Sequence, residues 1–208
     1  MTVVEIVDQV TAWAQKEICD KVRLKMPPEN DKDSDSAGYE YTMVTPTAFS
    51  LFIPSKEKLP PSVLSPIPSL CVRILEGEDS LTEKSGRITL EFCLCTWNPG
   101  IHEQDILFPD EKNHSIVHQW TGAEAEAYYQ RHYEGWRDAW NWVDVTLRAL
   151  ESHLDINGIE IDQSVGIKFY PLKEQEEISD FYPFWYACVQ FGVRRPLVRN
   201  IPSYQHLL

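Results

Sequence analysis

The chain has 208 residues, a formal net charge of −13 at pH 7, and 43% hydrophobic residues. This apolar content is enough for a substantial core and excludes a chain that is disordered over most of its length. A chain this acidic repels nucleic acid in general, because phosphate binding requires clustered Lys and Arg side chains. The acidity either maintains solubility or keeps a surface from adhering to DNA that passes nearby.

The cysteines and the hydropathy pattern indicate the environment of the chain. The number of cysteines is odd, and their spacings match neither a disulfide framework nor a set of zinc ligands. Reduced thiols in a cytosolic chain fit this pattern best. Residues 1–17 lack the apolar core of a signal peptide, and no run approaches the ~20 apolar residues of a membrane span, so we expect no membrane contact. The cysteines are Cys19, Cys71, Cys93, Cys95 and Cys188.

The N-terminal residues 2–19 are predicted to form an amphipathic helix. Apolar residues recur there at three- and four-residue steps, and Thr2 with Glu5 makes a capping-box pattern at its start. Alternation over residues 22–26 then predicts a short strand. The acidic residues 29–38 are predicted to be an exposed loop, because their alternating aspartates lack the glycine and glutamate of an EF-hand.

The next segment is rich in proline. Residues 46–68 hold six prolines, which remove ladder donors and exclude a long central strand. We expect an extended arm after a short strand at 39–44. Alternating runs at 70–74 and 87–96 predict a β-hairpin, with the polar residues 77–86 as its long loop. The residues expected to anchor the arm are Phe49, Leu51, Phe52 and Ile53.

The C-terminal half predicts a helix that lies on a sheet. Asn157-Gly158 is predicted to end the helix, because glycine tolerates the left-handed conformation found at helix ends. Alternation at 159–169 and again at 185–193 predicts strands with one covered face. The apolar stripe of the helix comprises Trp136, Ala139, Trp140, Val143, Leu147, Leu150 and Leu154.

These elements predict an α+β fold, with a mixed or antiparallel β-sheet packed against two main helices. We expect a single domain over residues 1–208. Within it, residues 29–68 form an acidic and proline-rich insert or arm, and residues 196–208 form a C-terminal tail.

Candidates for chemistry are few. Four-residue spacing would place His114 and His118 on one helix face, but no glutamate follows His114 as the metalloprotease motif requires. The chain contains no nucleophile elbow and no glycine-rich phosphate loop. We therefore predict no enzyme activity, no cofactor and no metal, with a metal-dependent enzyme as the alternative. The ligands in that alternative would come from His102, Glu103, Asp105, Asp110, His114 and His118.

The order of several short motifs resembles one known family. A strand at 86–90 leads into Thr96-Trp97-Asn98-Pro99-Gly100, a helix follows from Gly135, and Tyr182-Pro183-Phe184-Trp185-Tyr186 introduces the last strand. This order resembles the tail terminator, or tail completion, proteins of tailed bacteriophages and of prophages in Gram-positive bacteria. The resemblance extends over about residues 69–195, with an N-terminal helix in the expected place. The insert at 29–68 lies outside the family pattern.

The resemblance implies a structural protein of the virion tail or neck, assembled in the cytoplasm of the bacterial host. Such proteins form a ring, usually a hexamer, on the last ring of tail tube protein. The ring stops tube polymerisation and presents a surface to head-completion or connector proteins, while DNA passes through its lumen without specific binding. The alternative is another phage connector, neck or tail-tube component on a similar scaffold.

Ring formation has a physical requirement. Head-to-tail contacts that close into a ring use two different surfaces of one subunit. Exposed apolar and aromatic side chains are suited to such contacts, and an acidic lumen would let DNA slide without binding. The contact residues expected on this resemblance are Trp97, Asn98, Pro99, Phe108, Pro109 and Phe52.

Overall fold

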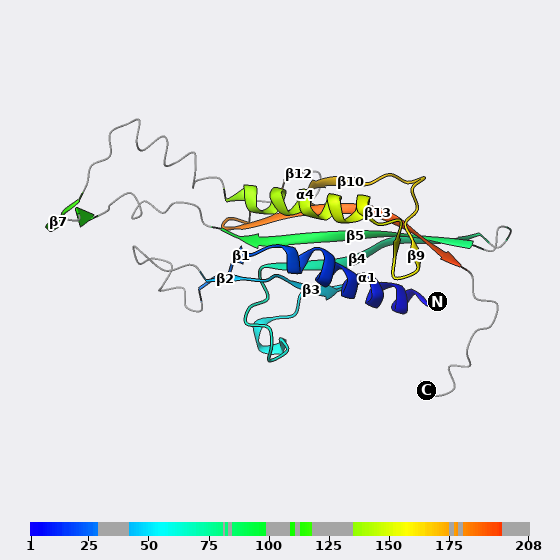
Figure 1. The fold of residues 1–208 in the computed structure, drawn as a ribbon, viewed down its shortest axis with the longest axis horizontal. Coiled ribbons are helices and arrows are strands. Elements are labelled where there is room, and N and C mark those ends of the chain that lie inside the picture. Colours follow the sequence, from blue (N-terminus) through cyan, green and yellow to red (C-terminus); the bar gives the residue numbers. More distant parts are fainter. Residues whose placement is uncertain are drawn as a thin grey trace.

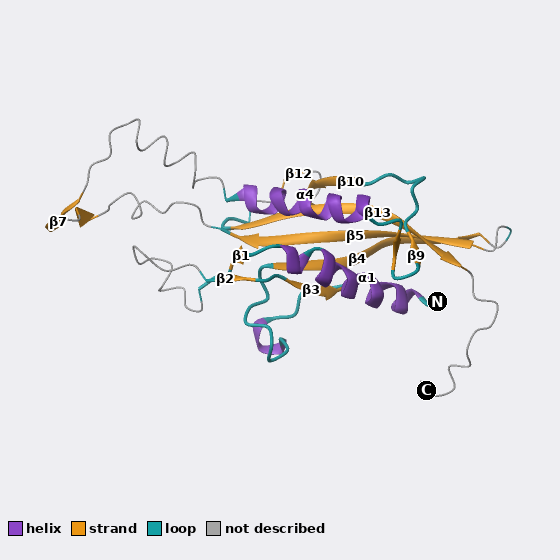
Figure 2. Cartoon of the chain, viewed as in Figure 1, coloured by secondary structure: helices purple, strands orange, loops and turns teal. Residues whose placement is uncertain are grey.

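The chain folds as an α+β protein in the computed structural model, with one five-stranded sheet and two long helices in its described part (Figure 2). This confirms the predicted fold class. The structure describes residues 1–28, 42–80, 82, 85–98, 109–110, 113–117, 135–174, 177–178 and 181–196.

The five-stranded sheet has the strand order β10-β13-β5-β4-β3. Its neighbours are antiparallel except β3 and β4, which are parallel, so the sheet is mixed. The proline-rich arm supplies only β3, a short edge strand, as expected from the missing donors of proline. The strands are β3 (Thr47–Ser50), β4 (Ser69–Ser80), β5 (Ser85–Trp97), β10 (Lys168–Pro171) and β13 (Phe184–Pro196).

The remaining strands form four small antiparallel pairs outside this sheet. Two short 3-10 helices, Cys19–Lys21 and Lys56–Lys58, complete the regular structure of the described residues. The pairs are β1 (Leu24–Lys25) with β2 (Met43–Val44), β6 (Pro109–Asp110) with β7 (Asn113–Val117), β8 (Asp155–Ile156) with β9 (Ile159–Glu160), and β11 (Lys173–Glu174) with β12 (Glu177–Ile178).

Helix α1 spans Val3–Glu17 and begins as the sequence predicts. The backbone N–H of Glu5 donates to Thr2 Oγ1 at 3.2 Å, and the Thr2 N–H donates to Glu5 Oε2 at 2.7 Å. This reciprocal capping box satisfies two of the N–H groups that the first turn leaves unpaired. The prediction for the N-terminal helix is therefore confirmed.

Helices α1 and α4 (Trp136–Ser152) pack their apolar sides against the same face of the sheet. In Figure 1, α1 lies along β3 and β4, whereas α4 lies along β13. Trp13 of α1 stacks on Phe92 of β5 at a centroid distance of 6.5 Å, and Phe92 contacts Phe191 of β13 at 4.8 Å. Each large side chain buried in this layer contributes about 1.5–3 kcal/mol to folding.

The predicted stripe of α4 is partly wrong. Ala139, Val143 and Leu150 are buried as expected, but Trp142, which lies outside the stripe, is also fully buried. The two ends of the stripe fail, because Trp136 is 42% exposed and Leu154 is 70% exposed. Leu154 lies beyond the end of the helix at Ser152, so the helical period no longer sets its direction.

The prediction that Asn157-Gly158 ends this helix is wrong. The two residues have φ angles of 52° and 86° and form the turn between β8 and β9. An Asn-Gly pair with both φ angles positive is the preferred two-residue turn of a β-hairpin. The Gly158 N–H donates to Asp155 Oδ1 at 2.8 Å, which further fixes the turn.

The predicted loop at 77–86 is mostly strand. β4 continues to Ser80 and β5 begins at Ser85, so the hairpin is longer and its connection shorter than expected. The register shifts once, between Ile74 and Glu76, and beyond the shift β4 is exposed, whereas Ile88 and Thr89 of β5 remain buried. Period-two patterning requires one covered face, so the exposed end of β4 carries no such pattern.

Candidate interaction surfaces

Asn98 joins three parts of the chain at one end of the sheet. Its N–H donates to the Pro183 carbonyl at 3.0 Å, and its Nδ2 donates to Asp138 Oδ2 of α4 at 2.7 Å. Lys25 Nζ donates to Asn98 Oδ1 at 3.1 Å, and Trp185 Nε1–H donates to the Asn98 carbonyl at 2.8 Å. The residue thus ties the end of β5 to β1, to α4 and to the start of β13.

This arrangement contradicts the expectation that Trp97 and Asn98 are exposed loop residues. Trp97 is the last residue of β5 and is only 4% exposed, and Asn98 is also buried. Buried side chains do not offer surface to another molecule. The hydrogen bonds of Asn98 at the end of β5 give these two residues a structural role in the Thr96–Gly100 motif.

Among the expected contact residues whose exposure the structure describes, which are Trp97, Asn98 and Phe52, only Phe52 lies on the surface. Its side chain is 68% exposed, and the neighbouring Leu51 is exposed as well. Leu51 has a φ angle of 67°, in the left-handed region that costs a residue with a Cβ about 1–2 kcal/mol. Its N–H still donates to the Val72 carbonyl of β4 at 2.8 Å. We call Leu51 and Phe52 the β3-edge patch, because they directly follow β3.

Helix α1 covers the outer side of β3. Gln15 Oε1 accepts the Ala48 N–H at 2.8 Å, and Gln15 Nε2 donates to the Pro46 carbonyl at 3.1 Å. The hydroxyls of Thr11 and Ser50 are hydrogen-bonded at 2.9 Å. A covered strand edge is protected from pairing with a further strand. A contact at this edge would therefore use the side chains of the β3-edge patch.

A second apolar surface lies at the opposite edge of the sheet. Phe169 of the edge strand β10 is 53% exposed, and its ring meets that of Trp140 at a centroid distance of 6.4 Å. Trp136 lies one helical turn before Trp140, and the Arg137 guanidinium lies 5.4 Å from its ring centroid. We call Trp136, Trp140 and Phe169 the β10-edge patch.

The two patches differ in composition and are far apart. They lie beside the first and last strands of the order β10-β13-β5-β4-β3. Four strand spacings of about 4.8 Å place these strands roughly 19 Å apart. The described part of the protein therefore carries two different apolar surfaces at opposite edges of one sheet.

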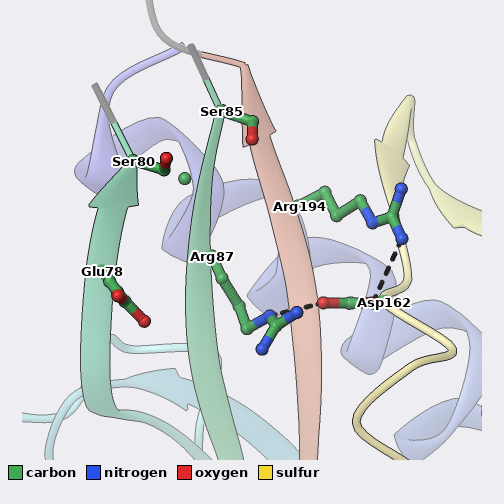
Figure 3. Close-up of a pocket in the computed structure, with 7 residues that line it drawn as sticks. Glu78, Ser80, Ser85, Arg87, Asp162 and Arg194 are labelled. Atoms are coloured by element: carbon green, nitrogen blue, oxygen red, sulfur yellow. Dashed lines mark hydrogen bonds and ion pairs between the residues drawn. The ribbon is translucent and has the colours of Figure 1, made fainter. Parts of the chain in front are cut away.

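A polar cavity of about 390 Å³ lies at the far end of the β4–β5 hairpin (Figure 3). Buried Asp162 is one of its lining residues, and Arg87 and Arg194 reach toward it from β5 and β13. Arg87 Nε donates to Asp162 Oδ2 at 2.5 Å, and Arg194 Nη2 lies 3.5 Å from Oδ1. The Ser164 hydroxyl donates to the same Oδ1 at 2.7 Å.

These contacts keep Asp162 ionised. The hydrogen bond from the Ser164 side chain lowers the pKa of the carboxyl group below its usual range, and Arg87 acts in the same direction against burial. Both carboxylate oxygens accept hydrogen bonds from this chain. The cluster is therefore suited to joining β5, β13 and the segment after β9, and a weak base of this kind is poorly suited to proton abstraction.

Several of the predicted contact and metal-ligand residues lie outside the described part of the chain. Outside the described residues lie Pro99, His102, Glu103, Asp105, Phe108 and His118, and Pro109 and Asp110 are described only as part of β6. The expected helical placement of His114 is wrong, because it lies in the strand β7. Among the described residues no group of three or more His, Cys, Asp or Glu side chains is arranged to hold a metal ion. No helix of the described part is long and apolar enough to cross a membrane.

Sequence patterns did not single out the β10-edge patch. Trp136 and Trp140 occupied core positions of a predicted helix, and Phe169 occupied the covered face of a predicted strand. The shared signal was the aromatic content of two segments that the fold brings together at a sheet edge. Large aromatic side chains are enriched at protein interfaces as well as in cores.

A scan against models of protein families finds no match to this chain, and a search of curated proteins finds no match.

Proposed function

We propose that this chain is a structural assembly protein that forms a closed ring through head-to-tail contacts. The observation that carries the proposal is the pair of apolar patches at opposite edges of the sheet. A head-to-tail contact joins two different surfaces, so every copy needs one of each. The β3-edge patch and the β10-edge patch meet this requirement.

The composition of the patches supports this role. Phe52, Phe169 and Trp136 are large apolar residues that the single chain leaves partly or mostly in solvent. Aromatic side chains of this kind dominate the binding energy of protein interfaces. The strained Leu51 backbone adds to the argument, because uncommon conformations of this type concentrate at functional sites.

The resemblance described above extends the proposal from a ring to a particular ring. We infer that the protein is a tail terminator, which binds the head-proximal end of a phage tail tube, ends its polymerisation and joins the tail to the head. Its partners in this role are further copies of itself, usually six to a ring in the resembled family, the tail tube protein and a head-completion protein. In this role the protein acts through its shape and its binding surfaces and uses no catalytic group.

A tail-tube component on a similar scaffold is the second candidate, favoured by the same two patches. The two roles differ in how far assembly proceeds. A tube protein stacks ring upon ring into long polymers, whereas a terminator stops after one ring.

Electron microscopy of the purified protein mixed with tail tubes tests the proposal. We expect one added ring at one end of each tube, and no growth beyond it. Phe52→Asp and Phe169→Asp each place a charge in one patch and should abolish the ring, while Leu154→Asp, at an equally exposed apolar position outside both patches, should retain it. Long stacks would favour the tube protein, and tubes without added rings would contradict the proposal.

A further inference from the structure

The sheet face that points away from the helices carries a row of thiols. Cys71 on β4, Cys93 on β5 and Cys188 on β13 are directly opposite one another in the two antiparallel registers. All three are buried and reduced, and they form an apolar cluster separate from the main core. Cys93 lies in the middle of the row and has a thiol neighbour on each side.

The hydrogen-bond pattern distinguishes the two neighbours of Cys93. The Asn98 N–H donates to the Pro183 carbonyl at 3.0 Å, which continues the β5–β13 register of Cys93 with Cys188. Hydrogen-bonded and non-hydrogen-bonded pairs alternate along an antiparallel ladder. Asn98 and Cys93 are an odd number of residues apart, so Cys93 and Cys188 form a non-hydrogen-bonded pair, whose Cα atoms lie about 4.5 Å apart.

The opposite holds on the other side of β5. The backbone groups of Cys93 point toward β4, so Cys93 and Cys71 form a hydrogen-bonded pair with Cα atoms about 5.5 Å apart. Side chains are closer in non-hydrogen-bonded pairs, and a disulfide needs Cβ atoms about 3.5–4.5 Å apart. Cys71 and Cys188 are separated by two strand spacings, roughly 9.6 Å. Register therefore favours Cys93 with Cys188.

The electrostatics of the row point to the same pair. A hydrogen bond from Cys188 lowers the pKa of the Cys93 thiol and raises the pKa of Cys188. Arg73 lies beside them, with Nη2 3.9 Å from Cys188 Sγ. Burial raises the pKa of Cys71 to about 11 and that of Cys95 to about 12. The thiolate is the reactive form, and Cys93 is both the middle thiol of the row and the one whose pKa is lowered.

We propose that Cys93 and Cys188 are an oxidisable pair, which hydrogen peroxide converts into a disulfide between β5 and β13. The Cys93 thiolate attacks one peroxide oxygen, the O–O bond breaks, and Cys93 becomes a sulfenic acid while hydroxide leaves. The Cys188 sulfur then attacks the Cys93 sulfur, the S–O bond breaks, and the second oxygen leaves as hydroxide, which takes up the Cys188 proton and becomes water. Two thiols and one peroxide give one disulfide and two waters, and two electrons pass from sulfur to oxygen.

The bond would change the stability of the chain independently of ring formation. It would close a long loop that contains α4 and join the central strand β5 to its neighbour β13. A cross-link over a long loop stabilises mainly by restricting the unfolded chain. The oxidised protein should therefore unfold at a higher temperature, and a reductant should reverse the shift.

Peroxide treatment followed by mass spectrometry tests the proposal on the full chain. The protein is purified reduced, freed of reductant, treated with hydrogen peroxide and digested without reduction. We expect the intact protein to lose two hydrogen atoms and one cross-linked peptide pair to appear. Cys93 and Cys95 share one tryptic peptide, so fragmentation between them must assign the bond to Cys93.

Single variants supply the matched comparison. Cys93→Ser and Cys188→Ser should each abolish the intramolecular bond, whereas Cys71→Ser, which removes the other neighbour of Cys93, should retain it. The peptide map of the peroxide-treated wild-type protein identifies the bonded cysteines even where a variant folds poorly. A bond between Cys71 and Cys93, gain of oxygen without loss of two hydrogens, or no reaction in the folded protein would each overturn the proposal.

Discussion

Gly135 packs against the backbone of Asn98 so closely that a Cβ at position 135 would lie 2.4 Å from the Asn98 carbonyl oxygen. The same Cβ would lie 2.8 Å from Trp185 Nε1, which donates a hydrogen bond to that carbonyl. Only glycine fits without a shift of the backbone. This contact and the Asn98–Asp138 hydrogen bond hold the end of β5 against the start of α4.

Gly135→Ala should destabilise the protein by about 2 kcal/mol, the usual scale of a steric overlap in a packed region. The φ and ψ angles of Gly135 are −56° and −26°, which suit alanine, so the loss would come from the contact with Asn98. Denaturant unfolding measures the free energy. Gly77→Ala is the matched control, because its Cβ would meet only ordinary contacts of 3.8 Å or more. Equal effects of the two changes would contradict the account of this junction.

Asp162→Asn should reduce stability by about 2 kcal/mol near pH 7, because the buried carboxylate gives up charged hydrogen bonds. The pKa of this carboxyl group is lowered in the folded state, chiefly by Ser164. Its contribution is therefore complete above the unfolded pKa of about 3.9 and disappears as the pH falls through the folded pKa.

The stability difference between wild type and Asp162→Asn should therefore shrink in acid. Denaturant unfolding at a series of pH values measures it. Asp79→Asn removes an exposed pair with Arg195 and should change the free energy of unfolding by less than about 0.5 kcal/mol at any pH. A difference for Asp162→Asn that stays constant below pH 4 would show that the carboxylate is not its source.

Leu51→Gly should leave the isolated protein as stable as wild type or up to about 1 kcal/mol more stable. Glycine relieves the left-handed strain at this position, and the greater freedom of the unfolded chain offsets part of the gain. Leu51→Ala keeps the strain and removes the same exposed side chain, so it should bring no gain. Thermal unfolding measures the stability of the two variants. A glycine variant that is no more stable than the alanine variant would refute the claim that the Leu51 backbone is strained.

Local patterns predicted those parts of the fold that depend on neighbouring residues in the chain. The capping box of Thr2 and Glu5 is complete within one helical turn, and it formed as expected. The alternation along β5 and β13 follows from one face covered by helices, and both strands lie where the pattern indicates. The α+β class follows from these elements together.

The failures arise where tertiary contacts decide. Asn98 and Pro99, the residues after Trp97, are typical of a turn and therefore predicted an exposed loop. Asn98 is instead held at the end of the sheet by hydrogen bonds with Pro183 and Trp185, which are distant in sequence. Phe169 has the spacing of a core residue, yet it lies on the edge strand β10 and is 53% exposed. Neither outcome is encoded in a short window of sequence.

The most direct test of the head-to-tail ring is to mix two defective variants. Phe52→Asp retains the β10-edge patch, and Phe169→Asp retains the β3-edge patch, so the mixture has one intact pair of surfaces. At concentrations where wild type associates, sedimentation velocity should show each variant alone as monomer and the equimolar mixture as a heterodimer that grows no further. Rings from either variant alone, or a mixture that stays monomeric while wild type associates, would contradict the account.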